Sequence, residues 1–299
     1  MRSSAPTGWP ALAEPVLSFG ERLDAVFSSR GRLCVGIDPH PYLLEQWRLP
    51  DSASGLRQFG LRVVEASVGH AGIVKPQVAF FERHGSAGYS ALEEVIAAAR
   101  SAGILVIADA KRGDVGTSVE AYGQSWLRPG SPLEADALTV SAFQGFGSLD
   151  QVVELAVENG KGLFILAATS NPEAAGIQQA VTAAGSSVAE SIASDAAEWN
   201  ALNSPSAARL GSLGLVLGAT VQLGAYGITS DSLVRTPILA PGFGHQGAQI
   251  ADFRRIFGAA SSSVVIAASR SILSAGPDGV AAAVARQQEE AAAAPADAS

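Results

Sequence analysis

The sequence from Ile104 to Asp114 is ILVIADAKRGD, an apolar run that is followed at once by charged residues. Such a run is typical of a strand buried on both faces, and the charges begin where that strand reaches the surface. Asp109 and Lys111 are two residues apart, so they point to the same side of an extended backbone, and Asp114 comes from the loop beyond them. Two carboxylates therefore bracket one ammonium group.

A lysine at this place is informative because the chain has only three lysines against seventeen arginines. A lysine can release its proton, whereas an arginine is effectively always charged. The motif therefore indicates a transferable proton on Lys111. The alternative interpretation is a surface ion pair at the end of a strand, which is common and contributes little to stability.

Eight short apolar runs lie along the chain, and segments with helical spacing, such as 91–100, 149–159 and 177–201, separate most of them. Strand followed by helix, eight times over, predicts an α/β fold with a single domain, the (β/α)8 TIM barrel. A doubly wound open sheet is the alternative. The predicted strands are Leu33–Ile37, Gly72–Lys75, Ile104–Asp109, Ala135–Val140, Leu163–Ala167, Leu213–Gly218, Ile238–Ala240 and Val264–Ala268.

The two ends of the chain differ in composition from the predicted barrel. We expect the barrel at residues 15–287, after a leader rich in Pro, Ser and Ala at 1–14 and before an Ala-rich tail at 288–299. The long connection from Ser170 to Gly211 is rich in Ala, Ser, Gln and Glu, which predicts one or two helices and a loop.

Bulk properties exclude several function classes. The net charge of −8 comes without a basic cluster, which argues against nucleic acid and anionic membranes as partners. No apolar run reaches the roughly 18 residues that a membrane span needs, and the first residues lack the pattern of a secretory signal. Cys34 is the only cysteine and is expected to be an inert buried thiol, so we predict a cytoplasmic protein. The four histidines show no metal-ligand spacing, so no metal site is expected.

Polar residues follow several of the predicted strands. Asp38, Lys75, Asp109, Ser170 and Arg270 all lie at or just beyond the carboxyl end of an apolar run. In TIM barrels the active site is built on this face. The sequence therefore predicts one site that collects these side chains.

Lys75 ends the second predicted strand, which neighbours the third strand in a barrel. A lysine is costly to bury unless it is paired with an acid. We therefore expect a chain of alternating charge, Lys75–Asp109–Lys111–Asp114, across two adjacent strands. Flanking carboxylates keep ammonium groups protonated, and a protonated lysine held over a substrate can deliver a proton to a developing carbanion.

Two segments near the end of the predicted barrel indicate an anion site. APGFGHQG at 240–247 follows the seventh strand, and its glycines let backbone N–H groups approach a phosphate while Gln246 adds a side-chain donor. Ser269-Arg270-Ser271 follows the eighth strand and places an arginine at the start of a helix. TIM barrels frequently bind phosphate with these two loops.

Taken together, these motifs resemble the orotidine 5′-phosphate decarboxylase family, in particular its longer bacterial branch. The likeness covers about residues 30 to 275, in the family's order. The DxKxxD motif is shared with related sugar-phosphate barrels, but Lys75 discriminates, since the related magnesium-dependent enzymes carry an acid there. The matching motifs are Gly36-Ile37-Asp38-Pro39, Val74-Lys75-Pro76, Asp109 to Asp114, Thr169-Ser170-Asn171-Pro172, Pro241 to Gly247, and Ser269-Arg270-Ser271.

The resemblance implies conversion of orotidine 5′-phosphate to UMP and CO2 in pyrimidine nucleotide synthesis, without a metal or an organic cofactor. It assigns Lys111 as the proton donor to C6 and places Asp109 near the departing carboxylate. Lys75 would bridge the charge network and the ribose, and Asp38 would bind ribose hydroxyls. Ser170 would contact the pyrimidine.

The same resemblance implies that Gln246 and Arg270 bind the phosphate of the substrate. Pro241 and Ser269 would be further substrate-binding residues. The resemblance also implies a homodimer with shared active sites. In this family the residue corresponding to Asp114 reaches into the neighbouring subunit's site, together with a hydroxyl residue shortly after it. Thr117 and Ser118 are both available for that role.

Two other functions stay open. One is a magnesium-dependent sugar-phosphate lyase on the same barrel, which a chelator would inhibit. The other is a catalytically silent nucleotide-binding barrel, although such a sensor has no need of a proton donor at Lys111.

Overall fold

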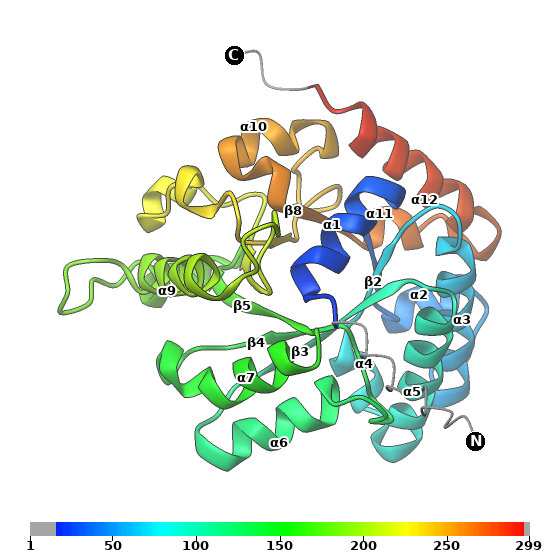
Figure 1. Cartoon of the computed structure of the whole chain (residues 1–299). Helices are drawn as coiled ribbons and strands as arrows, with labels where there is room; N and C mark the ends of the chain where they lie inside the picture. The colour runs from blue at the N-terminus through cyan, green and yellow to red at the C-terminus, as the bar shows by residue number, and fades with distance from the viewer. Residues whose placement is uncertain (1–15, 296–299) are drawn as a thin grey trace, which may run out of the picture.

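The computed structural model describes residues 16–295, and its central feature is a closed barrel of eight parallel strands (Figure 1). Each strand pairs with the next along the chain, and β8 pairs with β1, so the predicted TIM barrel is confirmed and the open sheet is wrong. The strands are β1 (Leu33–Ile37), β2 (Ile73–Pro76), β3 (Leu105–Arg112), β4 (Ala137–Val140), β5 (Gly162–Ala168), β6 (Leu213–Leu217), β7 (Ile238–Ala240) and β8 (Val264–Ala268).

Helices surround the barrel, and in the described chain β6 and β7 are joined by two 3-10 helices without an α-helix. The α-helices are α1 (Phe19–Arg30), α2 (Pro41–Gln46), α3 (Ala53–Ser67), α4 (Val78–Glu82), α5 (Gly85–Ser101), α6 (Gly116–Leu127), α7 (Asp150–Glu158), α8 (Ala175–Gln178), α9 (Val188–Asn203), α10 (Phe253–Phe257), α11 (Arg270–Leu273) and α12 (Gly276–Ala293). The 3-10 helices are η1 (Phe146–Leu149), η2 (Pro172–Ala174), η3 (Leu223–Tyr226), η4 (Ser230–Leu233), η5 (Ile250–Asp252) and η6 (Gly258–Ser263).

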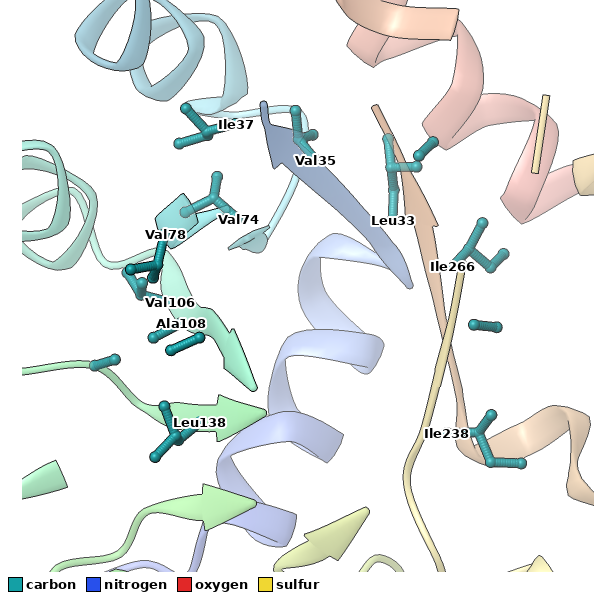
Figure 2. Close-up of a cluster of buried hydrophobic side chains, with 14 of the residues drawn as sticks. Leu33, Val35, Ile37, Val74, Val78, Val106, Ala108, Leu138, Ile238 and Ile266 are labelled. Carbon is teal, nitrogen blue, oxygen red and sulfur yellow. The ribbon is translucent and has the colours of Figure 1, made fainter. Parts of the chain in front are cut away.

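The strands are buried on both faces because alternate side chains enter two different cores. Leu33, Val35 and Ile37 of β1 join the larger core between the barrel and the outer helices, part of which Figure 2 shows. Cys34 belongs to a second core inside the barrel. Each buried branched side chain contributes roughly 1.5–3 kcal/mol, which explains why these runs are apolar throughout. The alternation also decides which residues further along each strand face the barrel axis.

Helix α1 closes the amino-terminal mouth of the barrel. Phe19 packs its ring against that of Phe164 in a T-shaped contact with centroids 5.9 Å apart. Gly162 makes room for this helix, since a Cβ there would lie 2.3 Å from the Phe19 ring. A capping box between Ser18 and Glu21 starts α1 at this place. One end of the barrel is therefore closed, and the site must be reached from the other end.

The long connection after β5 contains α8, α9 and the loop between them, as predicted. The predicted leader at 1–14 lies outside the described residues. The residue at which we placed the start of the tail, Gln288, lies within α12 and accepts a hydrogen bond from the backbone N–H of Leu33. Ala291 is buried as well, so the barrel's packing continues past residue 287. Within residues 16–295, no helix combines the length and the apolar character that crossing a membrane requires.

Candidate active site

A cleft lies over the carboxyl ends of the strands, on the face opposite α1. Six of the residues predicted for the site line it, namely Asp38, Lys75, Pro241, Gln246, Ser269 and Arg270. The backbones of β1 and β8 come close together here, and a Cβ on Gly36 would lie 2.6 Å from Cβ of Ser269. Glycine at position 36 therefore lets the two strand ends form one wall of the cleft.

The centre of the site is the carboxylate of Asp109, which holds two ammonium groups. Lys75 Nζ lies 2.7 Å from Asp109 Oδ2, and Lys111 Nζ lies 2.6 Å from Asp109 Oδ1. The side chain of Lys75 is 10% exposed, whereas that of Lys111 is 46% exposed. Three of the four predicted members of the charge network therefore meet within one chain, and of the two lysines Lys111 has the more exposed side chain.

The three charges stabilise one another despite their burial. Burial alone would raise the pKa of the Asp109 carboxyl, but the neighbouring Lys75 and Lys111 outweigh it and hold that pKa well below its usual range. Burial would likewise lower the pKa of Lys75, but the carboxylates of Asp109 and Asp38 outweigh it and raise that pKa. Lys75 and Asp109 are therefore a charged pair at neutral pH.

The backbone at Lys111 departs from the regular strand on which our prediction was based. Its φ is 49°, in the left-handed region that non-glycine residues rarely adopt. The register of β3 against β4 also shifts between Ala108 and Arg112. Such a conformation costs on the order of 1–3 kcal/mol, and irregularities of this kind are frequent beside active sites, where they redirect a side chain.

Two neutral side chains that no sequence motif had singled out complete the surroundings of Asp109. Gln77 Nε2 donates to Oδ2 at 3.1 Å, and Thr139 Oγ1 donates to Oδ1 at 3.0 Å. Each carboxylate oxygen thus accepts one bond from an ammonium group and one from a neutral group. A carboxylate has about four acceptor sites, so Asp109 is fully engaged and acts as a fixed charge.

Two buried polar atoms at the cleft have no hydrogen-bond partner among the described residues, Asp38 Oδ1 and Ser269 Oγ. Buried polar groups are normally paired, so both atoms are suited to bind a ligand in the cleft. Across residues 16–295, no three His, Cys, Asp or Glu side chains are grouped in a way that could hold a metal ion.

The loop after β7 forms the part of the cleft where we predicted an anion site. Gly242 and Gly244 have φ values of 116° and 73°, which glycine adopts without strain. Ser170, from the loop after β5, donates to Gln246 Oε1 at 3.0 Å, so this predicted pyrimidine contact is joined to the predicted phosphate contact. Phe243 and His245 also line the cleft, although the sequence motifs predicted no role for either side chain.

The remaining predicted residues do not join this group within one chain. Asp114 Oδ1 accepts a hydrogen bond from the backbone N–H of Val115, and no ion pair of the described residues includes Asp114. Thr117 and Ser118 lie in the first turn of α6 and are exposed. The Asp109 cluster of one chain therefore forms without these three side chains.

Comparison with known proteins places this geometry in a family. Residues 31–285 match the model of the orotidine 5′-phosphate decarboxylase / HUMPS family. The chain belongs to this family. An orotidine 5′-phosphate decarboxylase from a Nocardioides species is 51% identical over 251 residues, which cover 83% of this chain and 89% of that one. Another from Streptomyces coelicolor is 49% identical over 243 residues, covering 81% and 84%.

Solved structures agree with the family assignment. A crystal structure from Streptomyces avermitilis matches with a TM-score of 0.88 and 46% identity, and the match covers 96% of this chain and 99% of that one. The orotidine monophosphate decarboxylase of Leishmania donovani matches with a TM-score of 0.71 and 29% identity, covering 93% and 98%. The resemblance found in the sequence motifs is thereby confirmed.

Proposed function

We propose that the protein decarboxylates orotidine 5′-phosphate to UMP and CO2 in pyrimidine nucleotide synthesis, without a metal or an organic cofactor. The observation that carries the proposal is the Lys75–Asp109–Lys111 cluster at the carboxyl end of the barrel, in which Lys111 has the more exposed side chain of the two lysines. The names of relatives that are about half identical to this chain support the same reaction.

The chemistry needs one proton at one carbon. The bond between C6 and the carboxylate breaks, CO2 departs, and the electron pair stays on C6. Lys111 Nζ donates a proton to C6 to give UMP and then regains a proton from solvent, so that one proton is consumed per turnover. Asp109 holds Lys111 in place through a 2.6 Å bond, and its negative charge lies beside the carboxylate that leaves.

The cleft supplies groups for each part of the nucleotide. Asp38, with its unpaired buried oxygen, suits the ribose hydroxyls, and Lys75 lies between it and Asp109. Arg270 and the amide of Gln246 suit the phosphate, beside the glycine-rich backbone at 242–244. Ser170 donates to Gln246 and suits the pyrimidine. Binding energy gained at the phosphate, far from C6, can serve to orient the reacting carbon.

A homodimer with shared sites completes the proposal. Asp114 and the hydroxyls of Thr117 and Ser118 are available at the surface beside β3. Large apolar side chains are exposed in the same part of the chain, with Val115 next to Asp114 and Phe143 in the loop after β4. Exposed apolar side chains that gather in one patch are typical of surfaces that another protein covers. Asp114 of one chain would then supply the fourth charge beside the partner's Lys111. The cytoplasmic location stays a prediction.

An ultraviolet assay tests the reaction directly. Purified protein should consume orotidine 5′-phosphate with release of UMP, and the rate should be unchanged after treatment with EDTA. Loss of activity with EDTA, restored by Mg²⁺, would instead indicate the magnesium-dependent chemistry of the wider family. Tight binding of UMP without any turnover of orotidine 5′-phosphate would indicate a nucleotide-binding barrel.

A further inference from the structure

Thr139 is the one polar side chain of β4, and it lies inside the barrel with 1% of its surface exposed. Its neighbour on the same face of the strand, Ala137, belongs to the core within the barrel. A hydroxyl in such a place must find partners, because an unpaired buried polar group is costly. Its partners are both parts of the reactive cluster.

The hydroxyl of Thr139 joins Asp109 and Lys111 to each other. It donates to Asp109 Oδ1 at 3.0 Å and accepts a bond from the backbone N–H of Lys111 at 2.9 Å. The carbonyl of Ala108 lies 3.5 Å away, which is too far for a good bond, so the donated proton goes to the carboxylate. One hydroxyl thus contacts the side chain of one residue and the main chain of the other.

The bond to the main chain falls where the β3–β4 pairing is interrupted. Between Ala108 and Arg112 the register shifts, and Lys111 has its left-handed φ of 49°. The hydroxyl of Thr139 therefore takes the place of a strand carbonyl as the acceptor for the Lys111 N–H. A strained backbone persists only where its surroundings hold it, and the Thr139 hydroxyl is bonded directly to the main chain at this point.

The second hydrogen bond of the Thr139 hydroxyl contacts the side chain of Asp109. Asp109 Oδ1 accepts from both Thr139 Oγ1 and Lys111 Nζ, at 3.0 Å and 2.6 Å. The orientation of the carboxylate and the direction from which the ammonium group approaches it are therefore set together. We propose that Thr139 is a positioning residue that holds Lys111, through its backbone and through Asp109, where it can protonate the substrate. The loss of kcat that we expect when Thr139 is changed rests on the proposed function.

The Thr139→Val variant removes the hydroxyl and keeps the shape of the side chain. We expect its kcat to fall about 100-fold, because a misplacement of about 1 Å in a reacting group has an effect of that size. KM should stay within about threefold, since Asp38, Gln246 and Arg270 come from other strands. Thr139→Ser, which keeps the hydroxyl, should restore most of the kcat.

Thr236 offers a matched control. It is also 1% exposed, and its hydroxyl also serves as an acceptor, for Asn200 Nδ2 at 3.4 Å, but it precedes β7 at the closed end of the barrel. Thr236→Val should lower the melting temperature without changing kcat in the folded protein. Equal losses of kcat in Thr139→Val and Thr236→Val would show that removing any buried hydroxyl lowers kcat. That result would overturn the proposal.

Crystal structures of wild type and Thr139→Val give a measurement that does not depend on activity. In the variant we expect Lys111 to leave the left-handed region or to lose its bond to Asp109. An unchanged Lys111, or a kcat within about threefold of wild type, would each refute the positioning role. If Thr139→Val does not fold, Thr139→Ala replaces it, and failure of both while Thr139→Ser folds would assign Thr139 to stability instead. A wild-type protein that does not convert orotidine 5′-phosphate would refute only the proposed function, because the structures still report on Lys111.

Discussion

Lys161 Nζ lies 2.8 Å from Glu134 Oε1 at the closed end of the barrel, opposite the cleft. Asp136 is 3.8 Å from the same ammonium group, and Arg100 and Arg22 pair with Glu134 and Asp136. Burial alone would raise the pKa of the Glu134 carboxyl, but its bonds with Lys161 and the Gly130 N–H outweigh burial and hold that pKa below its ordinary value. With Lys75 and Lys111, all three lysines of the chain are therefore paired with carboxylates.

Lys161→Met should destabilise the protein without impairing the reaction. The substitution leaves arginine as the only positively charged partner of each of the two buried carboxylates, and removing one member of a buried ion pair typically costs about 3 kcal/mol. Denaturant unfolding should show a loss of that order, while kcat in the folded protein stays unchanged because the cleft is at the other end of the barrel.

An exposed ion pair supplies the comparison for this variant. Arg57 and Glu94 are about half exposed, and Arg57→Met should change the free energy of unfolding by less than about 1 kcal/mol. Equal stability of the Lys161→Met and Arg57→Met proteins would show that the network at the closed end contributes nothing beyond a surface pair.

Lys111→Ala should abolish turnover and leave the fold intact. In the proposed mechanism the carbanion at C6 needs an acid at this point, and Lys75 is buried against Asp109, so we do not expect it to replace Lys111. Steady-state assays should show less than about a hundredth of the wild-type kcat, with an unchanged circular dichroism spectrum. Lys111→Arg is the matched control: it keeps the charge but does not release a proton, so it should be inactive as well. Substantial activity in the arginine variant would show that charge alone is required.

Arg270→Ala should weaken substrates that carry the phosphate and spare those that lack it. A bond from arginine to a phosphate contributes about 1.5–3 kcal/mol, so kcat/KM for orotidine 5′-phosphate should fall roughly 10- to 100-fold. Any reaction of the nucleoside orotidine should be unaffected. Arg286→Ala, on the exposed face of α12, is the control and should change neither rate. Equal losses on orotidine and on its 5′-phosphate would remove Arg270 from the phosphate site.

Mixed dimers test whether Asp114 acts in the partner's site. Asp114→Asn and Lys75→Ala homodimers should each be nearly inactive. A dimer with one chain of each kind has one site with both defects and one site with neither. Random pairing should therefore restore up to about a quarter of the wild-type activity, since half of the dimers are mixed and half of their sites are intact.

Co-expression of the two chains with different affinity tags gives the cleanest form of this experiment. Dimers that carry both tags should have about half of the wild-type activity per dimer. If the doubly tagged dimers are as inactive as the parents, then Asp114 works within its own chain and the shared-site proposal is wrong.

The barrel and most of the site could be predicted because both leave local signals in the sequence. Short apolar runs mark strands buried on both faces, and all eight predicted strands are found within a few residues of their expected bounds. A polar residue directly after such a run stands out, which is how Asp38, Lys75 and Asp109 were recognised. Their side chains meet because the barrel brings the carboxyl ends of all strands to one face.

Thr139 and the irregular backbone at Lys111 had no such signal. Thr139 lies inside its apolar run, where a threonine is also an ordinary strand former. The place of Thr139 in the site follows only from the alternation of side chains along β4, because Thr139 is the next inward-facing residue after Ala137. Lys75 follows Ile73 in the same way, and Asp109 follows Ile107. Lysine has no preference for a left-handed backbone, so the shift in register at Lys111 depends on the contacts with β4.

The closing of the barrel by α1 has a consequence for how the chain is made. Helix α1 is held by residues that are synthesised much later than it is, as the bond from Arg22 to the carbonyl of Gly160, 138 positions away, illustrates. Until β5 exists, Phe19 has no Phe164 to pack against, and the apolar face of α1 remains exposed. Contacts between such distant residues slow folding. The helix that begins the described chain is therefore among the last parts that can reach their final place.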